Sequence, residues 1–243
     1  MTGTKAAIIA QLQREILPLQ GIKTGTNKLL PDVGLGPVKN AFVNAAFPLG
    51  AIHEFMYSCA EDAAATIGFV VALLASFRGN KGASIWISSS RILFPPAIKS
   101  FLIDPDKIIF IDLHKEKEIL WATEEALKCT GLTAVIGEMQ ELSFIASRRL
   151  QLAVEQSEVT GFILRRNPRS INTTACFTRW KITSLPSELP GDMPGVGFPR
   201  WKVELLKVRN GKPGKWQLEY SAGRFWHIPT VTAIPIEQQK KTG

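Results

Sequence analysis

Hydrophobic and polar positions between residues 50 and 165 alternate between short apolar runs and longer runs of helical period. The short runs are typical of buried strands and cover residues 52–57, 84–87, 107–111, 133–136 and 160–164. The longer runs predict helices at residues 63–77, 95–102, 115–128 and 141–158. Strands that are apolar throughout and alternate with helices indicate an α/β fold with a mostly parallel sheet covered on both faces.

The pattern changes after residue 165. Residues 174–182, 201–208 and 216–220 alternate Trp, Val and Phe with polar residues, which predicts antiparallel strands. The last two are joined by RNGKPG (209–214), in which Asn-Gly favours a tight turn. The segment SLPSELPGDMPGVGFP (184–199) is rich in Pro and Gly and predicts a long loop.

This pattern divides the chain into three parts. Residues 1–40 predict an amphipathic N-terminal helix and a linker, residues 41–225 a core with a C-terminal β module, and residues 226–243 a tail. No run of about 18 apolar residues occurs, so we expect no membrane span. Three widely spaced cysteines indicate reduced thiols and a cytoplasmic protein.

Charge is distributed unevenly along the chain. Residues 1–164 hold 15 Lys and Arg against 16 Asp and Glu, a balance of −1, whereas residues 165–243 hold 14 against 5, a balance of +9. The last third is therefore a basic module, which favours a polyanion or an acidic protein as partner.

The segment FPLGAIHEFMYSCAEDAAATIGFVVALL (47–74) has the strand, short loop and long helix of a phosphate-binding P-loop. Its loop, however, lacks the glycines and the lysine of such a site and consists of Ser58, Cys59, Ala60, Glu61 and Asp62. The two acids would complement the helix dipole where a phosphate normally binds. We expect a capped helix that binds no nucleotide, with an unusual nucleotide site as the alternative.

Metal-binding residues are sparse. His53, His114 and His227 have no Cys or His neighbour at ligand spacing. In folds of this kind a magnesium-binding carboxylate often ends a central strand, and Glu138 stands one position late for that role. We expect Glu138 to be solvated or ion-paired, and we expect no metal site and no cofactor.

The helix predicted at residues 141–158 carries an arginine among apolar positions. At 100° per residue, Arg149 falls in the middle of a face formed by Leu142, Ile145, Ala146, Leu150, Ala153 and Val154. An arginine there must be paired or line a groove. We expect either an ion pair with Glu138, Glu124 or Glu125 or a binding role.

Basic residues interleaved with Trp follow the last core strand. Such a pattern suits the phosphates and bases of DNA, a protein interface, or a merely solvated face. The candidate DNA-binding or partner-binding residues are Arg149, Arg165, Arg166, Arg169, Arg179, Arg200, Lys202, Lys207, Arg209 and Lys212.

Several segments carry a resemblance to known proteins. FPLGAIHEF resembles the strand that precedes the P-loop in RecA-like recombinases, and PRWKVELLKVRNGKPGKWQLEY resembles their closing antiparallel strands. ILWATEEALKCTGLTAVIGEM, LSFIASRRLQLAVEQSEVTGFILRR and the RW…RNGKPG tail together resemble the ImuA family, over about residues 45–220.

This resemblance implies a RecA-like fold and a non-enzymatic role in damage-induced translesion DNA synthesis. The implied partners are an ImuB-like Y-family polymerase homologue, an error-prone C-family polymerase and RecA. It also places the catalytic glutamate of RecA at Ser89, Ser90 and Arg91 and the magnesium aspartate at Gly137. NPRSINT (167–173) corresponds in position to a DNA-binding loop of RecA.

The resemblance leaves alternatives. EEALKCTGLTAVIGE is also similar to SulA, a related fold that inhibits cell division by binding FtsZ, although chains of that type lack the RNGKPG tail. A RecA paralogue that binds single-stranded DNA, or a cryptic ATPase, is a third hypothesis.

Overall fold

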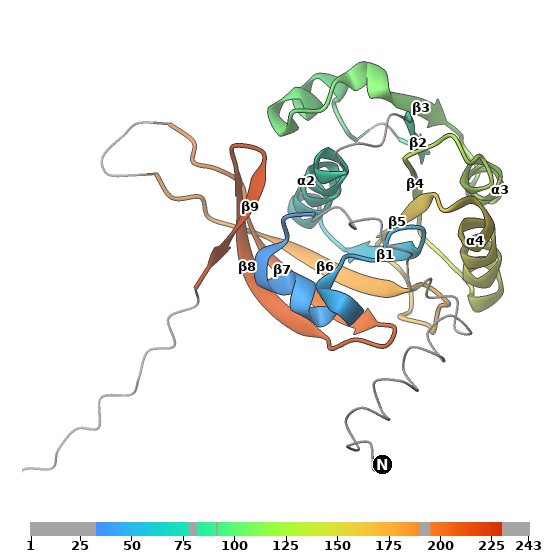
Figure 1. The fold of residues 1–243 in the computed structure, drawn as a ribbon. Helices are drawn as coiled ribbons and strands as arrows, with labels where there is room; N and C mark the ends of the chain where they lie inside the picture. Colours follow the sequence, from blue (N-terminus) through green and yellow to red (C-terminus); the bar gives the residue numbers. More distant parts are fainter. Residues whose placement is uncertain (1–32, 78–81, 91, 190–194, 230–243) are drawn as a thin grey trace, which may run out of the picture.

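The computed structural model describes residues 33–77, 82–90, 92–189 and 195–229. Within these residues, nine strands form one sheet in the order β3-β2-β4-β5-β1-β6-β7-β8-β9 (Figure 1). The strands are β1 (Ile52–Tyr57), β2 (Ser84–Ser88), β3 (Ile108–Asp112), β4 (Ala134–Met139), β5 (Thr160–Arg166), β6 (Thr178–Leu185), β7 (Arg200–Val208), β8 (Gly214–Ser221) and β9 (Arg224–Ile228).

The helices among the described residues agree with the periodicity of the sequence. They are α2 (Ala60–Ser76), α3 (Glu116–Leu127) and α4 (Phe144–Ser157), with shorter 3₁₀ turns η1 (Gly36–Ala41), η2 (Val43–Ala45), η3 (Pro95–Phe101) and η4 (Pro105–Lys107). Ser143 begins α4, because its hydroxyl accepts a hydrogen bond from the backbone N–H of Ala146. Glu158, with a φ of 62°, ends the same helix.

The sheet separates two hydrophobic cores. Helix α2 lies within the curve of the sheet, over the larger core that contains Phe55, Phe69 and Trp180 (Figure 1). Helices α3 and α4 lie side by side on the outer face, over a smaller core that includes Leu150 and Ile163. Helix α2 is apolar nearly all round because it is enclosed by the sheet and by η3.

The sheet is parallel from β3 to β6 and antiparallel from β6 to β9. The prediction of a mostly parallel sheet with antiparallel strands at the C-terminal end is confirmed. Its detail is corrected at β6, which pairs antiparallel with β7 but parallel with β1. Because a parallel neighbour needs a crossover connection, residues 167–177 must carry the chain back across β1.

The boundaries of the core differ from those expected. Val33, Leu35 and Val38, at the end of the predicted linker, belong to the larger core, and the N–H of Lys212 donates to the Ala41 carbonyl. At the other end, β9 reaches Ile228, so the first residues of the predicted tail belong to the sheet. The predicted N-terminal helix and the rest of the tail lie outside the described residues.

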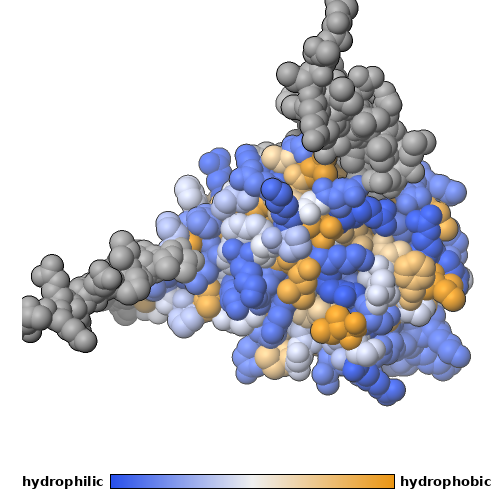
Figure 2. All heavy atoms as spheres, turned by 90° about the horizontal axis from the view of Figure 1, so that it is seen from below, coloured by the Kyte–Doolittle hydropathy of each residue, from blue (hydrophilic) through white to orange (hydrophobic). Residues whose placement is uncertain are grey.

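The face seen from below Figure 1 is mostly hydrophilic, with hydrophobic residues in small groups between charged ones (Figure 2). Within the described part of the chain, no helix has the length and apolarity needed to cross a membrane.

Candidate functional site

Helix α2 begins directly after the loop that corresponds to a phosphate loop. Cys59 is its N-cap residue, and Glu61 and Asp62 lie in its first turn, as predicted. A backbone N–H and the side chain of Cys59 hold the pKa of Glu61 below its usual value. Two carboxylates at the positive end of a helix complement its dipole and oppose the binding of an anion.

The carboxyl end of β4 carries Glu138, which turns toward β2. Trp86 Nε1 donates to Glu138 Oε1 at 2.6 Å, and Glu138 is only 7% exposed. Burial raises the pKa of Glu138 to about 7, although the bond from Trp86 and the charge of Arg166 act in the opposite direction. The expectation of a solvated glutamate is therefore wrong, because Glu138 is buried against an indole, and among the described residues Glu138 has no ion pair.

Neighbouring positions define which side of β4 faces α2. A Cβ atom at Gly137 would lie 2.6 Å from Thr123 Oγ1 of α3, so residue 137 faces the α3–α4 side of the sheet. The carboxylate on the α2 side is Glu138, one position after Gly137, where the resemblance places the magnesium aspartate. Among the described residues, no three His, Cys, Asp or Glu side chains form a group that could hold a metal ion.

Tyr57 ends β1 on the same side. It is 2% exposed, and its hydroxyl has no hydrogen-bond partner among the residues that the structure describes. Burial and the nearby charge of Glu138 raise the pKa of Tyr57 above its usual value. The side of the sheet that faces α2 thus holds a buried acid bonded to an indole, and a buried phenol whose pKa is raised by burial and by the charge of that acid.

His53 is a structural residue of β1. Its Nε2 lies 2.8 Å from the Pro48 carbonyl and its Nδ1 lies 2.7 Å from Thr178 Oγ1. Burial lowers the pKa of His53 to about 3, so the ring is neutral and donates its Nε2–H to the carbonyl. The Thr178 hydroxyl donates to Nδ1 and accepts a bond from Trp180 Nε1.

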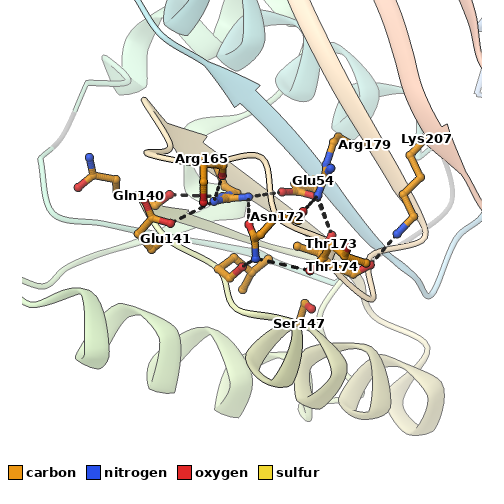
Figure 3. Close-up of polar contacts among 12 residues, drawn as sticks. Glu54, Gln140, Glu141, Ser147, Arg165, Asn172, Thr173, Thr174, Arg179 and Lys207 are labelled. Carbon is orange, nitrogen blue, oxygen red and sulfur yellow. Dashed lines mark hydrogen bonds and ion pairs between the residues drawn. The ribbon is translucent and has the colours of Figure 1, made fainter.

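On the opposite face of β1, residues 167–177 cross the sheet from the end of β5 to the start of β6, and a buried ion network fixes this crossover (Figure 3). Glu54 is fully buried, and its Oε1 accepts a bond from Arg165 Nη1 at 2.7 Å. Its Oε2 accepts from Arg179 Nε and from Thr174 Oγ1, both at 2.8 Å. Two guanidinium groups and a hydroxyl therefore satisfy one buried carboxylate, as burial of charge requires.

Further bonds hold the crossover against the start of α4. Asn172 Nδ2 donates to the Leu142 carbonyl at 2.8 Å, and its Oδ1 accepts from Arg165 Nη1 at 3.1 Å. The backbone N–H of Ala175 donates to Ser147 Oγ at 2.9 Å. The segment that corresponds in position to a DNA-binding loop is thus bound along its length by internal contacts.

Comparison with known proteins decides the family. No protein-family model matches the chain. Two curated proteins are similar to it, Protein ImuA of Caulobacter vibrioides strain NA1000 / CB15N and Protein ImuA of strain ATCC 19089 / CIP 103742 / CB 15. Each is 33% identical over 212 residues, which cover 82% of this chain and 87% of the relative. The chain belongs to the ImuA family.

In this member of the ImuA family, two of the candidate binding arginines are internal. Arg165 has a fully buried side chain and that of Arg179 is 10% exposed, and both pair with Glu54. Their prediction as DNA-binding or partner-binding residues is corrected, because their charge is already satisfied inside the protein and cannot reach a partner at the surface.

Arg149 forms an ion pair, which was one of the two expectations for this residue. Its Nη2 lies 2.5 Å from Glu124 Oε2, which links α4 to α3. Its placement within an apolar face was wrong, because its side chain is 57% exposed and Ile145, assigned to that face, is 74% exposed. The buried side of α4 carries Leu150, Ala153 and Val154, as predicted, together with Ser147 and Gln151.

The remaining candidates lie at or near the surface. Arg200 pairs with Glu188 and Glu219, and Lys202 lies 3.4 Å from Glu204. Lys207 and Arg209 donate to the Thr174 and Ala175 carbonyls of the crossover. The exposed candidates are Arg166, Arg169 and Lys212. The structure therefore disperses the basic residues over several elements instead of gathering all of them in one site.

Sequence reasoning missed Glu54, Asn172 and Thr174 as partners of the basic residues. One signal was present, because Glu54 is an acid within a short run otherwise suited to a fully buried strand. A buried acid requires a cation, and Arg165 occupies the end of a strand with the same apolar character. For Asn172 and Thr174 the sequence holds no comparable signal.

Proposed function

We propose that this ImuA-family protein is a non-enzymatic accessory protein of damage-induced translesion DNA synthesis in the cytoplasm. It binds an ImuB-like Y-family polymerase homologue, an error-prone C-family polymerase and RecA, and it needs no cofactor. Membership of the ImuA family supports a role in damage-induced mutagenesis.

One observation carries the non-enzymatic part of the proposal, namely the chemistry at the start of α2. Catalysis of phosphoryl transfer requires backbone N–H groups, a lysine and a metal-binding side chain around the phosphates. Here Glu61 and Asp62 lie at the helix N-terminus, and Glu138 is engaged by Trp86. These side chains favour a scaffold whose helix is stabilised by its own acids instead of by a bound nucleotide.

The association part is tested by co-purification with each of the three partners from a strain treated with a DNA-damaging agent. We expect the tagged protein to retain at least the Y-family homologue, and that complex to re-form from purified proteins. If the protein bound none of the three partners, the proposal would fail, and inhibition of FtsZ would be the next hypothesis to measure.

The non-enzymatic part is tested by nucleotide-dependent thermal stabilisation, because a ligand that binds only the folded state raises the unfolding temperature. We expect no shift with ATP and magnesium, under conditions where RecA shows one. A clear shift that disappears on adding EDTA would show that the site still binds a nucleotide.

A further inference from the structure

Helix α4 exposes apolar side chains on the side that faces away from the sheet. Phe144 is 53% exposed, Ile145 74% and Leu152 44%. Ile145 and Leu152 are seven residues apart, which is two helical turns and places them on the same side of α4. A single exposed apolar residue needs no explanation, but three on one face of a 14-residue helix mark a surface that another molecule covers.

The crossover extends this surface at the start of α4. Ile171 is 69% exposed. Residues near it are held against the segment just before α4, because Asn172 donates to the Leu142 carbonyl and the N–H of Arg169 donates to Glu141 Oε1 at 2.9 Å. The internal contacts of the crossover thus present Ile171 beside the first turn of the helix. We call Phe144, Ile145, Leu152 and Ile171 the α4 surface.

Arginines surround the α4 surface. Arg148 and Arg149 stand between Ile145 and Leu152 along the helix, and their side chains are 48% and 57% exposed. Arg148 lies 3.8 Å from Glu155 and Arg149 pairs with Glu124, so part of their charge is offset. Arg169 on the crossover is exposed as well. Exposed arginine side chains therefore border the apolar residues, and two of them have acidic partners within the chain.

We propose that the α4 surface binds an amphipathic helix of a partner protein that carries acidic residues beside its apolar ones. The seven-residue spacing of Ile145 and Leu152 matches the apolar repeat of a second helix packed along α4. Acidic residues flanking that repeat would meet Arg148, Arg149 and Arg169. The inference rests on the proposed function, because the helix would belong to one of the polymerase subunits or to RecA.

The composition of the surface favours protein over nucleic acid as the occupant. Single-stranded nucleic acid is bound mainly by aromatic rings that stack on bases and by cations that follow the phosphates. Three of the four residues of the α4 surface are aliphatic and offer no ring for stacking. Aliphatic side chains in heptad spacing instead suit packing against another helix.

The test measures binding of each purified partner, the Y-family homologue, the C-family polymerase and RecA, to the full chain by biolayer interferometry. We expect the double variant Ile145→Asp/Leu152→Asp to lose at least tenfold in affinity for a partner that the wild type binds. Val196→Asp is the matched control, because Val196 is 93% exposed in the loop before β7, and we expect its affinity to be unchanged. Both substituted residues of α4 are exposed, so circular dichroism and the unfolding temperature should match those of the wild type.

The outcomes distinguish a failure of the inference about the α4 surface from a failure of the proposed function. If the wild type binds none of the three partners, the proposed function fails and the surface loses its occupant. If the wild type binds and the double variant binds equally well, the proposed function stands and the inference about the α4 surface is overturned. Loss of binding to a single-stranded oligonucleotide alone, or a change from dimer to monomer in light scattering, would likewise overturn it in favour of DNA or a second copy.

Discussion

Two buried carboxylates on neighbouring parts of the sheet differ in how they are satisfied. Glu54 on β1 bonds to two guanidinium groups and a hydroxyl, all within 2.8 Å. Glu138 on β4 receives one hydrogen bond from a neutral indole at 2.6 Å. Both are nearly inaccessible to water, yet within the part of the chain that the structure describes only Glu54 has a positive partner in direct contact.

The two sites differ in the role of the buried carboxylate: Glu54 is part of an ion network that holds the fold, whereas the charge of Glu138 depends on pH. Glu54 pairs with both Arg165 and Arg179, and those arginines in turn fix the crossover. Burial raises the pKa of Glu138 to about 7, so its charge depends on the surrounding pH. Predictions therefore differ for the two sites.

The largest effect is expected for Glu54→Ala. The change leaves Arg165 fully buried with only the longer ion pair to Glu141 at 3.4 Å, and breaking a buried pair costs about 3–5 kcal/mol in the free energy of unfolding. Urea unfolding followed by tryptophan fluorescence measures the loss. The exposed Glu61→Ala serves as the control, with a much smaller expected loss because only a surface interaction with the helix dipole is removed. A similar small loss for Glu54→Ala would mean that the network is not a unit.

A pH-dependent effect of intermediate size is expected for Glu138→Gln, which keeps an oxygen to accept the Trp86 bond. The folded-state pKa of Glu138, about 7, lies above the unfolded value, so the folded protein holds a proton that the unfolded chain releases. Wild-type stability relative to the variant is therefore fully present below pH 4.5 and declines as pH rises through 7. The slope approaches about 1.4 kcal/mol per pH unit. Parallel stability curves for the two proteins between pH 4.5 and 8 would contradict the burial of an unpaired carboxylate.

A smaller loss is expected for Asn172→Ala, about 1–3 kcal/mol, because Arg165 and the Leu142 carbonyl each lose a buried partner. Cleavage by trypsin at Arg169 should become faster, since the crossover is then held by fewer bonds. Thr183→Ala on the uncovered part of β6 is a suitable control. Unchanged cleavage would show that the Glu54 contacts alone hold the segment.

The smallest effect is expected for Arg149→Ala. Its pair with Glu124 is short, but more than half of the arginine side chain is exposed, and such pairs contribute about 0–1 kcal/mol. Thermal unfolding at low and high salt measures the contribution, which should vanish at high salt. A loss as large as that of Glu54→Ala would remove the distinction between buried and exposed pairs.

Much of the fold could be predicted from local pattern. The bounds of β1 follow from a short, mostly apolar run of six residues, and the β7–β8 hairpin follows from the Asn210-Gly211 turn, where Asn210 adopts a φ of 55°. The position of Glu61 and Asp62 in the first turn of α2 could likewise be predicted, because the two acids follow directly after a strand and a short loop. These features depend on neighbours in sequence.

What failed depends on contacts between distant residues. The buried side of α4 includes Ser147 and Gln151, because their side chains accept bonds from the backbone of Ala175 and Ile52. A pattern that counts only apolar positions assigns that side to Ile145 instead and places Arg149 in it. Arg165 and Arg179 are buried because the crossover passes over Glu54. The residues next to each arginine in the sequence give no sign of that path.

The position of β1 has a consequence for synthesis on the ribosome. Its two neighbours in the sheet, β5 and β6, lie more than 100 residues later in the chain, and His53 meets Thr178 across 125 residues. At about 5–20 residues per second, β1 waits roughly 6–25 s after translation before its second edge can pair. Only α2 and the residues around it can shield this apolar strand meanwhile. The hairpins that follow β6 form between close neighbours, so docking of β6 against β1 would be the late event that joins the two halves of the sheet.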